Sequence, residues 1–181
     1  MNAKWNRSFK ALFSLAVCAV TSVSSAAYAI SPASPGTPMK PDQVNTARWE
    51  KAWTNLVNDV RQSFKPALPK LEAVEVELVL GNPENAKDRL TLTVLDADGA
   101  VLSTVSKVVE AWKCDHVLFA LSNGGLDVTP GQTYALKLSG GTTFGWKYIV
   151  GGYDKGAASF NGRPLLPDAR STFLFRTFGA K

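Results

Sequence analysis

Residues 71–80, LEAVEVELVL, constrain the fold more than any other stretch of the chain, because apolar side chains alternate along them with polar ones. Glu75 and Glu77 share one face. The apolar residues of the opposite face are Val74, Val76, Leu78 and Leu80. Since successive side chains of a strand point to opposite faces, the alternation predicts a strand with one buried face. A second layer must cover that face.

The same alternation recurs toward the C-terminus, at 90–94 and 101–109. Turn signals separate these runs. They are Asp-Ala-Asp-Gly at 96–99, Pro130-Gly131 and Asn161-Gly162, all of which favour tight turns. About eight short strands follow one another with no convincing helix between them, so we expect an all-β, antiparallel β-sandwich and not a parallel α/β sheet.

The segment from 42 to 60 is ambiguous. Its apolar residues Trp49, Trp53, Leu56, Val57 and Val60 are spaced by three and four. This spacing predicts a helix, with Asp42 as its N-cap. Trp, Val, Thr and Asn are mediocre helix formers, however, so a strand or loop stays open as the alternative.

The N-terminus has the pattern of a secretory signal. Residues 1–10 are basic, 11–23 are apolar, and Ala27-Tyr28-Ala29 provides small residues for cleavage. The apolar run is shorter than the ~20 residues of a membrane span. We therefore predict a signal peptide at 1–29, a secreted protein (periplasmic or extracellular), and no membrane span.

Residues 30–41 contain four prolines and predict an extended linker, which leaves one domain at 42–181. The leader carries three of the 20 Lys and Arg residues and none of the 15 acidic ones, so the remaining chain has a net charge near +2. No Lys/Arg-rich run is present, and we expect no nucleic-acid partner.

The sequence offers few candidate catalytic residues. We therefore expect that the protein is not an enzyme and has no catalytic residue. Cys114 is the only cysteine after the leader, and burial is the expected state of such a thiol. With His116 it could form a dyad or a metal pair, but no third group completes either arrangement. Glu75 and Glu77 would lie ~7 Å apart, as in an inverting glycosidase, yet they equally suit a solvated face.

Several segments resemble a known group of proteins. They are DQVN at 42–45, QSFKPALPKLEAVEVEL at 62–78, LDVTPGQTYALKLSG at 126–140, YDKGAASFNGRPL at 153–165 and DARSTFLFRTFG at 168–179. This pattern is similar to secreted bacterial β-sandwich domains of the kind related to jelly-roll carbohydrate-binding modules and galactose-binding-like domains.

The resemblance covers 42–181 and implies a jelly-roll-like sandwich of about eight strands. It also implies strand or loop at 55–65, with at most one short N-terminal helix before it. Some relatives carry a hydrophobic sorting tail. This chain ends at Lys181 without one, so we expect release and not anchoring.

The aromatic stretch FGWKY at 144–148 permits two interpretations. Phe144, Trp146 and Tyr148 share one face, which either fills the core or forms a stacking platform for a sugar. In the second case the neighbouring loop and hairpin supply polar groups. The candidate ligand-binding residues are then Trp146, Tyr148, Tyr153, Asp154, Asn161 and Arg163.

Jelly-roll modules often hold a structural calcium ion, and the resemblance implies Asp42, Asn45 and Asp168 as ligands near the two ends of the domain. No other cofactor is expected. These observations predict a monomeric, secreted, non-catalytic binding module, with a glycan as its most plausible ligand. The alternative is a structural or protein-interaction module of the cell envelope or extracellular matrix, with an envelope protein as partner.

Overall fold

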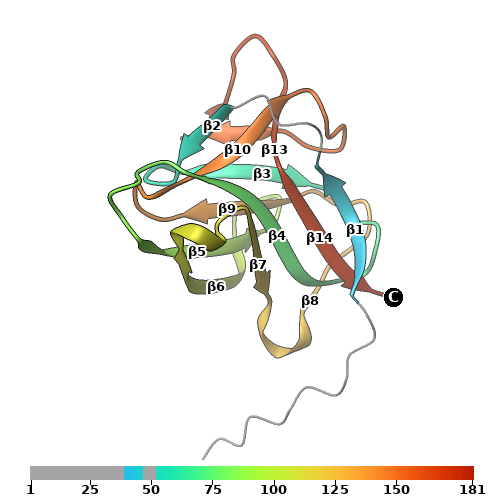
Figure 1. The fold of residues 1–181 in the computed structure, drawn as a ribbon. Coiled ribbons are helices and arrows are strands. Elements are labelled where there is room, and N and C mark those ends of the chain that lie inside the picture. The colour runs from blue at the N-terminus through green and yellow to red at the C-terminus, as the bar shows by residue number, and fades with distance from the viewer. Residues whose placement is uncertain (1–38, 47–51) are drawn as a thin grey trace, which may run out of the picture. The chain divides into compact units, whose positions relative to one another are not determined.

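The computed structural model describes residues 39–46 and 52–181, which form two antiparallel β-sheets (Figure 1). The predicted all-β sandwich is confirmed. The eight-stranded sheet contains β1 (Lys40–Asn45), β2 (Ala52–Asn55), β4 (Lys70–Leu80), β7 (His116–Ala120), β8 (Leu126–Asp127), β10 (Phe144–Val150), β13 (Ser171–Phe173) and β14 (Phe175–Ala180). The six-stranded sheet contains β3 (Val60–Phe64), β5 (Lys87–Leu95), β6 (Val101–Glu110), β9 (Tyr134–Ser139), β11 (Ala158–Phe160) and β12 (Arg163–Pro164). The predicted signal peptide and all but the end of the linker lie outside the described residues.

Strand β4 organises the eight-stranded sheet. It pairs with β14 and β10, and also with β7 and β8. Its apolar side chains, which include Val74, Val76 and Leu78, are fully buried between the sheets, while Glu75 and Glu77 lie on the outer face. The face assignment made from the alternation at 71–80 is therefore correct.

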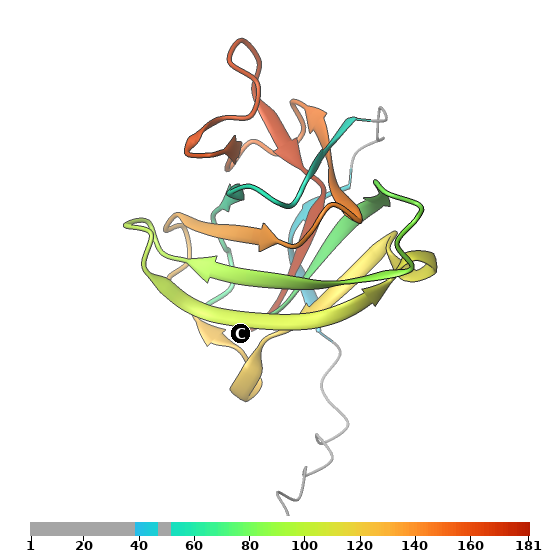
Figure 2. The same cartoon turned by 90° about the vertical axis from the view of Figure 1, so that its left-hand side faces the viewer.

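The six-stranded sheet has the order β12-β11-β3-β9-β5-β6, and the long β5–β6 hairpin forms one of its borders (Figure 2). The predicted turn at 96–99 closes this hairpin, because the Asp96 carboxylate accepts hydrogen bonds from the backbone N–H groups of Asp98 and Ala100. The predicted Asn161-Gly162 turn joins β11 to β12, and both residues have positive φ, 52° and 74°. The residues of these two turns therefore favour the two hairpins that are observed.

Of the two alternatives left open for 42–60, the strand is correct for the described part, and the strand or loop expected at 55–65 is confirmed. Residues 52–55 form β2 of the eight-stranded sheet, and 60–64 form β3 of the six-stranded sheet, with a bend between them. Leu56 and Val60 are buried where the chain crosses from one sheet to the other, whereas Trp53 and Val57 are exposed. Two short strands with a crossing between them therefore imitate the spacing of a helix. Residues 47–51 lie outside the described part.

The two ends of the sandwich meet, because β1 pairs antiparallel with β14 at one border of the eight-stranded sheet (Figure 1). Strand β1 begins at Lys40, two residues before the predicted domain start, and includes Pro41. A proline is tolerated in an edge strand because its missing N–H can face solvent.

Helical structure in the described residues is confined to two single 3₁₀ turns, η1 (Ala111–Lys113) and η2 (Ser122–Gly124). No helix of this part of the chain is long and apolar enough to cross a membrane.

Candidate functional site

The predicted aromatic platform lies in the core. Trp146 is 0% exposed, stacks on Phe173 with ring centroids 4.3 Å apart, and donates its Nε1–H to the carbonyl of Leu174 at 2.9 Å. Tyr148 is half-buried and meets the same Phe173 ring edge-on. The core interpretation of FGWKY is therefore correct, and Trp146 cannot offer its ring to a ligand in this structure.

Tyr153, the third predicted aromatic, is also part of the interior. Its hydroxyl donates to Gln43 Oε1 at 2.9 Å and accepts from the backbone N–H of Lys65 at 3.2 Å. Its ring meets Phe175 edge-on, with centroids 5.2 Å apart. Burial raises the pKa of Tyr153 to about 12, so the hydroxyl stays protonated and acts as a structural tie.

The remaining candidates lie on exposed turns. Asp154 and Arg163 are exposed, and so is Asn161, whose Oδ1 accepts a hydrogen bond from the backbone N–H of Asp59. The six predicted ligand-binding residues therefore divide between the core and the surface and do not form one surface.

The calcium candidates have separate roles. The Asp42 carboxylate accepts the backbone N–H of Ala67, and the Asn45 amide donates to Thr172 Oγ1 and to the carbonyl of Phe173. Asp168 is exposed in the loop before β13. Within 39–46 and 52–181, no three His, Cys, Asp or Glu side chains are grouped to hold a metal ion. Asp42 and Asn45 thus have structural hydrogen-bond partners, and the calcium site stays a prediction.

Cys114 and His116 do not form a dyad. The Cys114 thiol is buried, and burial, followed by the nearby Asp115 charge, raises its pKa. The His116 side chain is instead half-exposed on the outer face, with Nδ1 3.5 Å from Glu75 Oε1 and 4.0 Å from Glu77 Oε1. The thiol is thus protonated and has no base beside it, as a structural cysteine would be.

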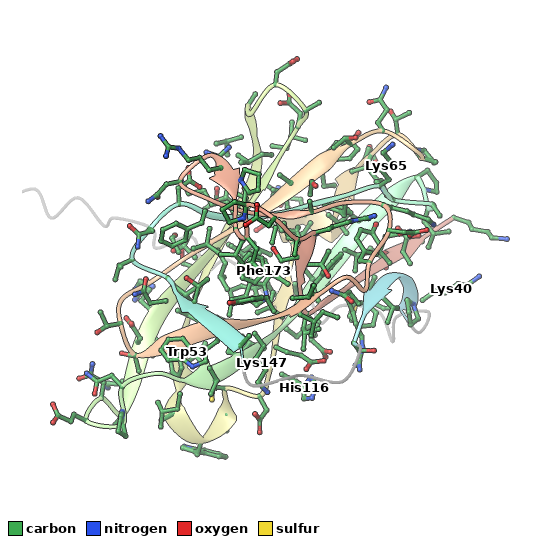
Figure 3. All side chains as sticks on the ribbon, turned by 90° about the horizontal axis from the view of Figure 1, so that it is seen from above. Lys40, Trp53, Lys65, His116, Lys147 and Phe173 are labelled. Atoms are coloured by element: carbon green, nitrogen blue, oxygen red, sulfur yellow. The ribbon has the colours of Figure 1, made fainter. Side chains whose placement is uncertain are left out.

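A different constellation lies on the outer face of the eight-stranded sheet. Trp53 on β2 is opposite Lys147 on β10, and Glu77 on β4 is opposite His116 on β7. Leu174 links the two pairs, because its N–H donates to the Lys147 carbonyl and its carbonyl accepts the Glu77 N–H. We call Trp53, Lys147, Glu77 and His116 the outer-face row. Figure 3 shows Lys147 between Trp53 and His116.

Trp53 lies flat on the sheet because glycines leave room for it. A Cβ added at Gly145 would come within 2.0 Å of Trp53 Cε3, and one at Gly81 within 3.1 Å of Trp53 Cη2. The inner side of the indole is therefore in contact with the backbone, while the residue as a whole remains 41% exposed. This arrangement leaves one side of a large aromatic ring available to a ligand.

Charged groups of both signs surround the row. Lys147 Nζ lies 3.3 Å from Asp115 Oδ1, and Arg176 Nη1 lies 2.9 Å from Glu75 Oε1. His116 is within ion-pair distance of both glutamates. The row thus combines an aromatic surface with several hydrogen-bond donors and acceptors.

One feature of the sequence indicated a close contact at the outer-face row, although the apolar spacing at 42–60 was compatible with a helix and gave Trp53 no clear place. Gly145 stands inside an aromatic strand, between Phe144 and Trp146. A glycine within a strand often marks a close approach by another group. Here that group is the Trp53 ring, which comes from a strand 92 positions earlier in the chain.

Comparison with known proteins adds no relative. No family model matches the sequence, and no curated protein matches it either. What is shown is therefore the class, an antiparallel β-sandwich, while the likeness to carbohydrate-binding modules stays a prediction from the sequence motifs.

Proposed function

We propose that this protein is a secreted, non-catalytic binding module that holds a glycan on its outer-face row. The observation that carries the proposal is Trp53, whose indole lies flat over Gly145 and Gly81 and keeps 41% of its surface exposed. Sugars present an apolar face of C–H groups, which suits contact with an indole. A supported and preoriented ring loses little conformational freedom on binding.

The rest of the row suits sugar hydroxyls. The half-exposed His116 can donate or accept a hydrogen bond, and the less exposed Lys147 and Glu77 beside it add a donor and an acceptor. The row crosses the sheet from β2 to β7, which at the usual strand spacing is ~19 Å. This length favours a chain of several sugar units over a single one.

The carboxylates of this face favour binding over hydrolysis. Glu75 is held by Arg176, and Lys147 lies beside Asp115. A glycosidase needs one carboxyl group that stays protonated at working pH and one that is ionised. Both carboxylates are already engaged by cationic side chains, so they suit a binding surface that accepts hydrogen bonds from a ligand.

A glycan array probed with the exported wild-type protein is the first test. The hit is then titrated by calorimetry against three variants. Trp53→Ala and Gly145→Ala are expected to abolish binding, the second because the new Cβ displaces the indole without removing it. Trp112→Ala is the matched control, because Trp112 is exposed at η1 and lies outside the row.

Each variant is checked by thermal unfolding, so that loss of binding is separated from loss of fold. No signal for the wild type on a broad array would contradict the proposal. So would full binding by folded Trp53→Ala, which would place any glycan elsewhere on the molecule.

A protein-interaction module is the second candidate function, and one observation favours it. Five of the ten exposed large apolar side chains of the described residues belong to β6, η1 and β7. They are Val101, Leu102, Val108, Trp112 and Leu118. Exposed apolar side chains that recur along neighbouring elements are a feature of surfaces that contact another macromolecule.

A further inference from the structure

Strand β6 is a long and unprotected edge. It has ten residues, contains no proline, and among the described strands pairs with β5 alone. Its pairing with β5 is regular from Ser103 to Glu110, with one register shift near Val101. Edge strands with these properties readily pair with another strand.

Two other border strands, β1 and β12, are blunted. Strand β1 carries Pro41 and a register shift between Pro41 and Val44. Strand β12 has two residues, one of which is Pro164. Prolines, irregular pairing and short length are the usual devices that prevent edge-to-edge pairing. Residues 103–110 have none of these devices, and β6, with its ten residues, is twice as long as β7, another regular strand that pairs with one neighbour.

The backbone groups of β6 that face outward follow from its pairing. The N–H of Ala111 bonds to the carbonyl of Ala86 in line with the β5 ladder, so odd-numbered residues face β5. In an antiparallel ladder the intervening residues direct N–H and C=O to the other side. The backbone N–H and C=O groups of Thr104, Ser106 and Val108 therefore point away from β5, toward the free edge of the sheet.

Lys107 does not obstruct this edge. Its exposed side chain reaches toward β7, where Nζ donates to the Leu118 carbonyl at 3.0 Å and lies 5.9 Å from the centroid of the Phe119 ring. A hollow of about 400 Å³ opens beside it, lined by residues of β6, η1 and β7. The charge is thus held within its own chain, away from the line along which a partner strand would lie.

We propose that β6 pairs antiparallel with β6 of a second copy of this chain, so that two six-stranded sheets become one continuous sheet. The pairing is centred on Ser106, which places Thr104 opposite the partner's Val108 and Val105 opposite the partner's Lys107. This twofold arrangement uses the same surface on both copies, as closed dimers usually do. This dimer is the alternative to the monomer predicted from the sequence.

Charge and strand regularity select this register. Moving the centre to Lys107 would place two lysines opposite each other, which destabilises a strand pair. Moving it toward Val105 would bring the irregular residues near Val101 into the ladder. Centring on Ser106 avoids both, and Val108, 49% exposed in the single chain, gains an apolar contact with the partner's Thr104 methyl group.

An identical strand suits the edge better than a charged peptide. Residues 101–110 contain one lysine and one glutamate, so two copies bring no net charge together. The prolines of 30–41 make that segment of the same chain a poor strand partner, because each proline lacks an N–H.

Sedimentation velocity of the exported protein, from micromolar to millimolar concentration, tests the proposal. The wild type is expected to shift toward twice the monomer mass as concentration rises. Thr104→Lys/Val108→Lys places like charges opposite each other and should stay monomeric. Thr104→Lys/Val108→Glu places opposite charges there and should dimerise again. Val150→Lys, which alters an exposed valine of β10, is the control and should dimerise like the wild type.

Amide hydrogen exchange of the wild type gives a second readout that needs no variant. Exchange at Thr104, Ser106 and Val108 should slow as concentration rises, while Val105 and Lys107, which face β5, should not change. A wild type that stays monomeric overturns the proposal. So does a Lys/Lys variant that dimerises, or a folded Lys/Glu variant that does not. Glycan binding by the monomeric variant is measured in parallel as a separate readout, and the glycan array on the wild type tests the proposed function by itself.

Discussion

Gln62 Oε1 accepts a 2.7 Å hydrogen bond from the backbone N–H of Phe173 and so joins the two sheets of the sandwich. Gln62 belongs to β3 of the six-stranded sheet and Phe173 to β13 of the eight-stranded sheet. The side chain is fully buried, and its Nε2 donates to the Ser63 carbonyl at 2.8 Å. Both ends of the amide are therefore satisfied inside the molecule, as buried polar groups require.

Gln62→Leu should destabilise the fold by ~1–3 kcal/mol, because the Phe173 N–H would be buried without a partner. Urea denaturation at neutral pH measures the change. Gln62→Glu is the matched comparison. Its ionised carboxylate would face the Ser63 carbonyl, so the variant should regain stability when the pH is lowered enough to protonate it. A Gln62→Leu protein as stable as the wild type would contradict the role of this bond.

Trp146→Ala should cost ~3–5 kcal/mol, since it removes a fully buried ring and its stacking on Phe173. That is a large part of the 5–15 kcal/mol typical of a domain. Trp53→Ala should cost clearly less, because Trp53 is partly exposed. Thermal melts of the two variants side by side measure the difference, and equal losses would refute the assignment of one ring to the core and the other to the surface.

Stability should fall between pH 10 and about 12 because of Tyr153, whose folded-state pKa is raised to about 12. In this window the unfolded chain loses the tyrosine proton while the folded chain keeps it. The folded state therefore binds more protons, and raising the pH favours unfolding by up to ~1.4 kcal/mol per pH unit. Tyr153→Phe should show a shallower decline of the unfolding free energy in urea titrations across this range. An unchanged slope would contradict the pKa shift.

The exported protein should begin at Ile30, because Ala27-Tyr28-Ala29 is the expected cleavage site. N-terminal sequencing of the protein recovered from the periplasm or medium measures this directly. Ala29→Arg removes the small residue before the cut and should leave the precursor unprocessed. A wild-type protein that retains Met1 would remove the argument for secretion.

Local patterns predicted those parts of the fold that local interactions determine. The faces of β4 and the turn at Asn161-Gly162 were read correctly, since alternation and turn residues act over a few positions. The crossing of the chain from β2 to β3 was not predicted from the sequence. The spacing of the apolar residues there depends on which of the two sheets each strand joins. For the same reason the sequence left open which face of β10 is buried. Phe144 and Trp146 belong to the core cluster, while Trp53 covers Gly145 on the opposite face from a distant strand.

The pairing of β1 with β14 has a mechanical consequence. Lys40 lies opposite Gly179, so the chain enters and leaves the sandwich at the same corner. A force that pulls residues 39 and 181 apart would act at one end of this ladder and break its hydrogen bonds one after another, as a zipper opens. The sandwich would therefore begin to yield under low tension at β1, while the β4-centred core stayed folded.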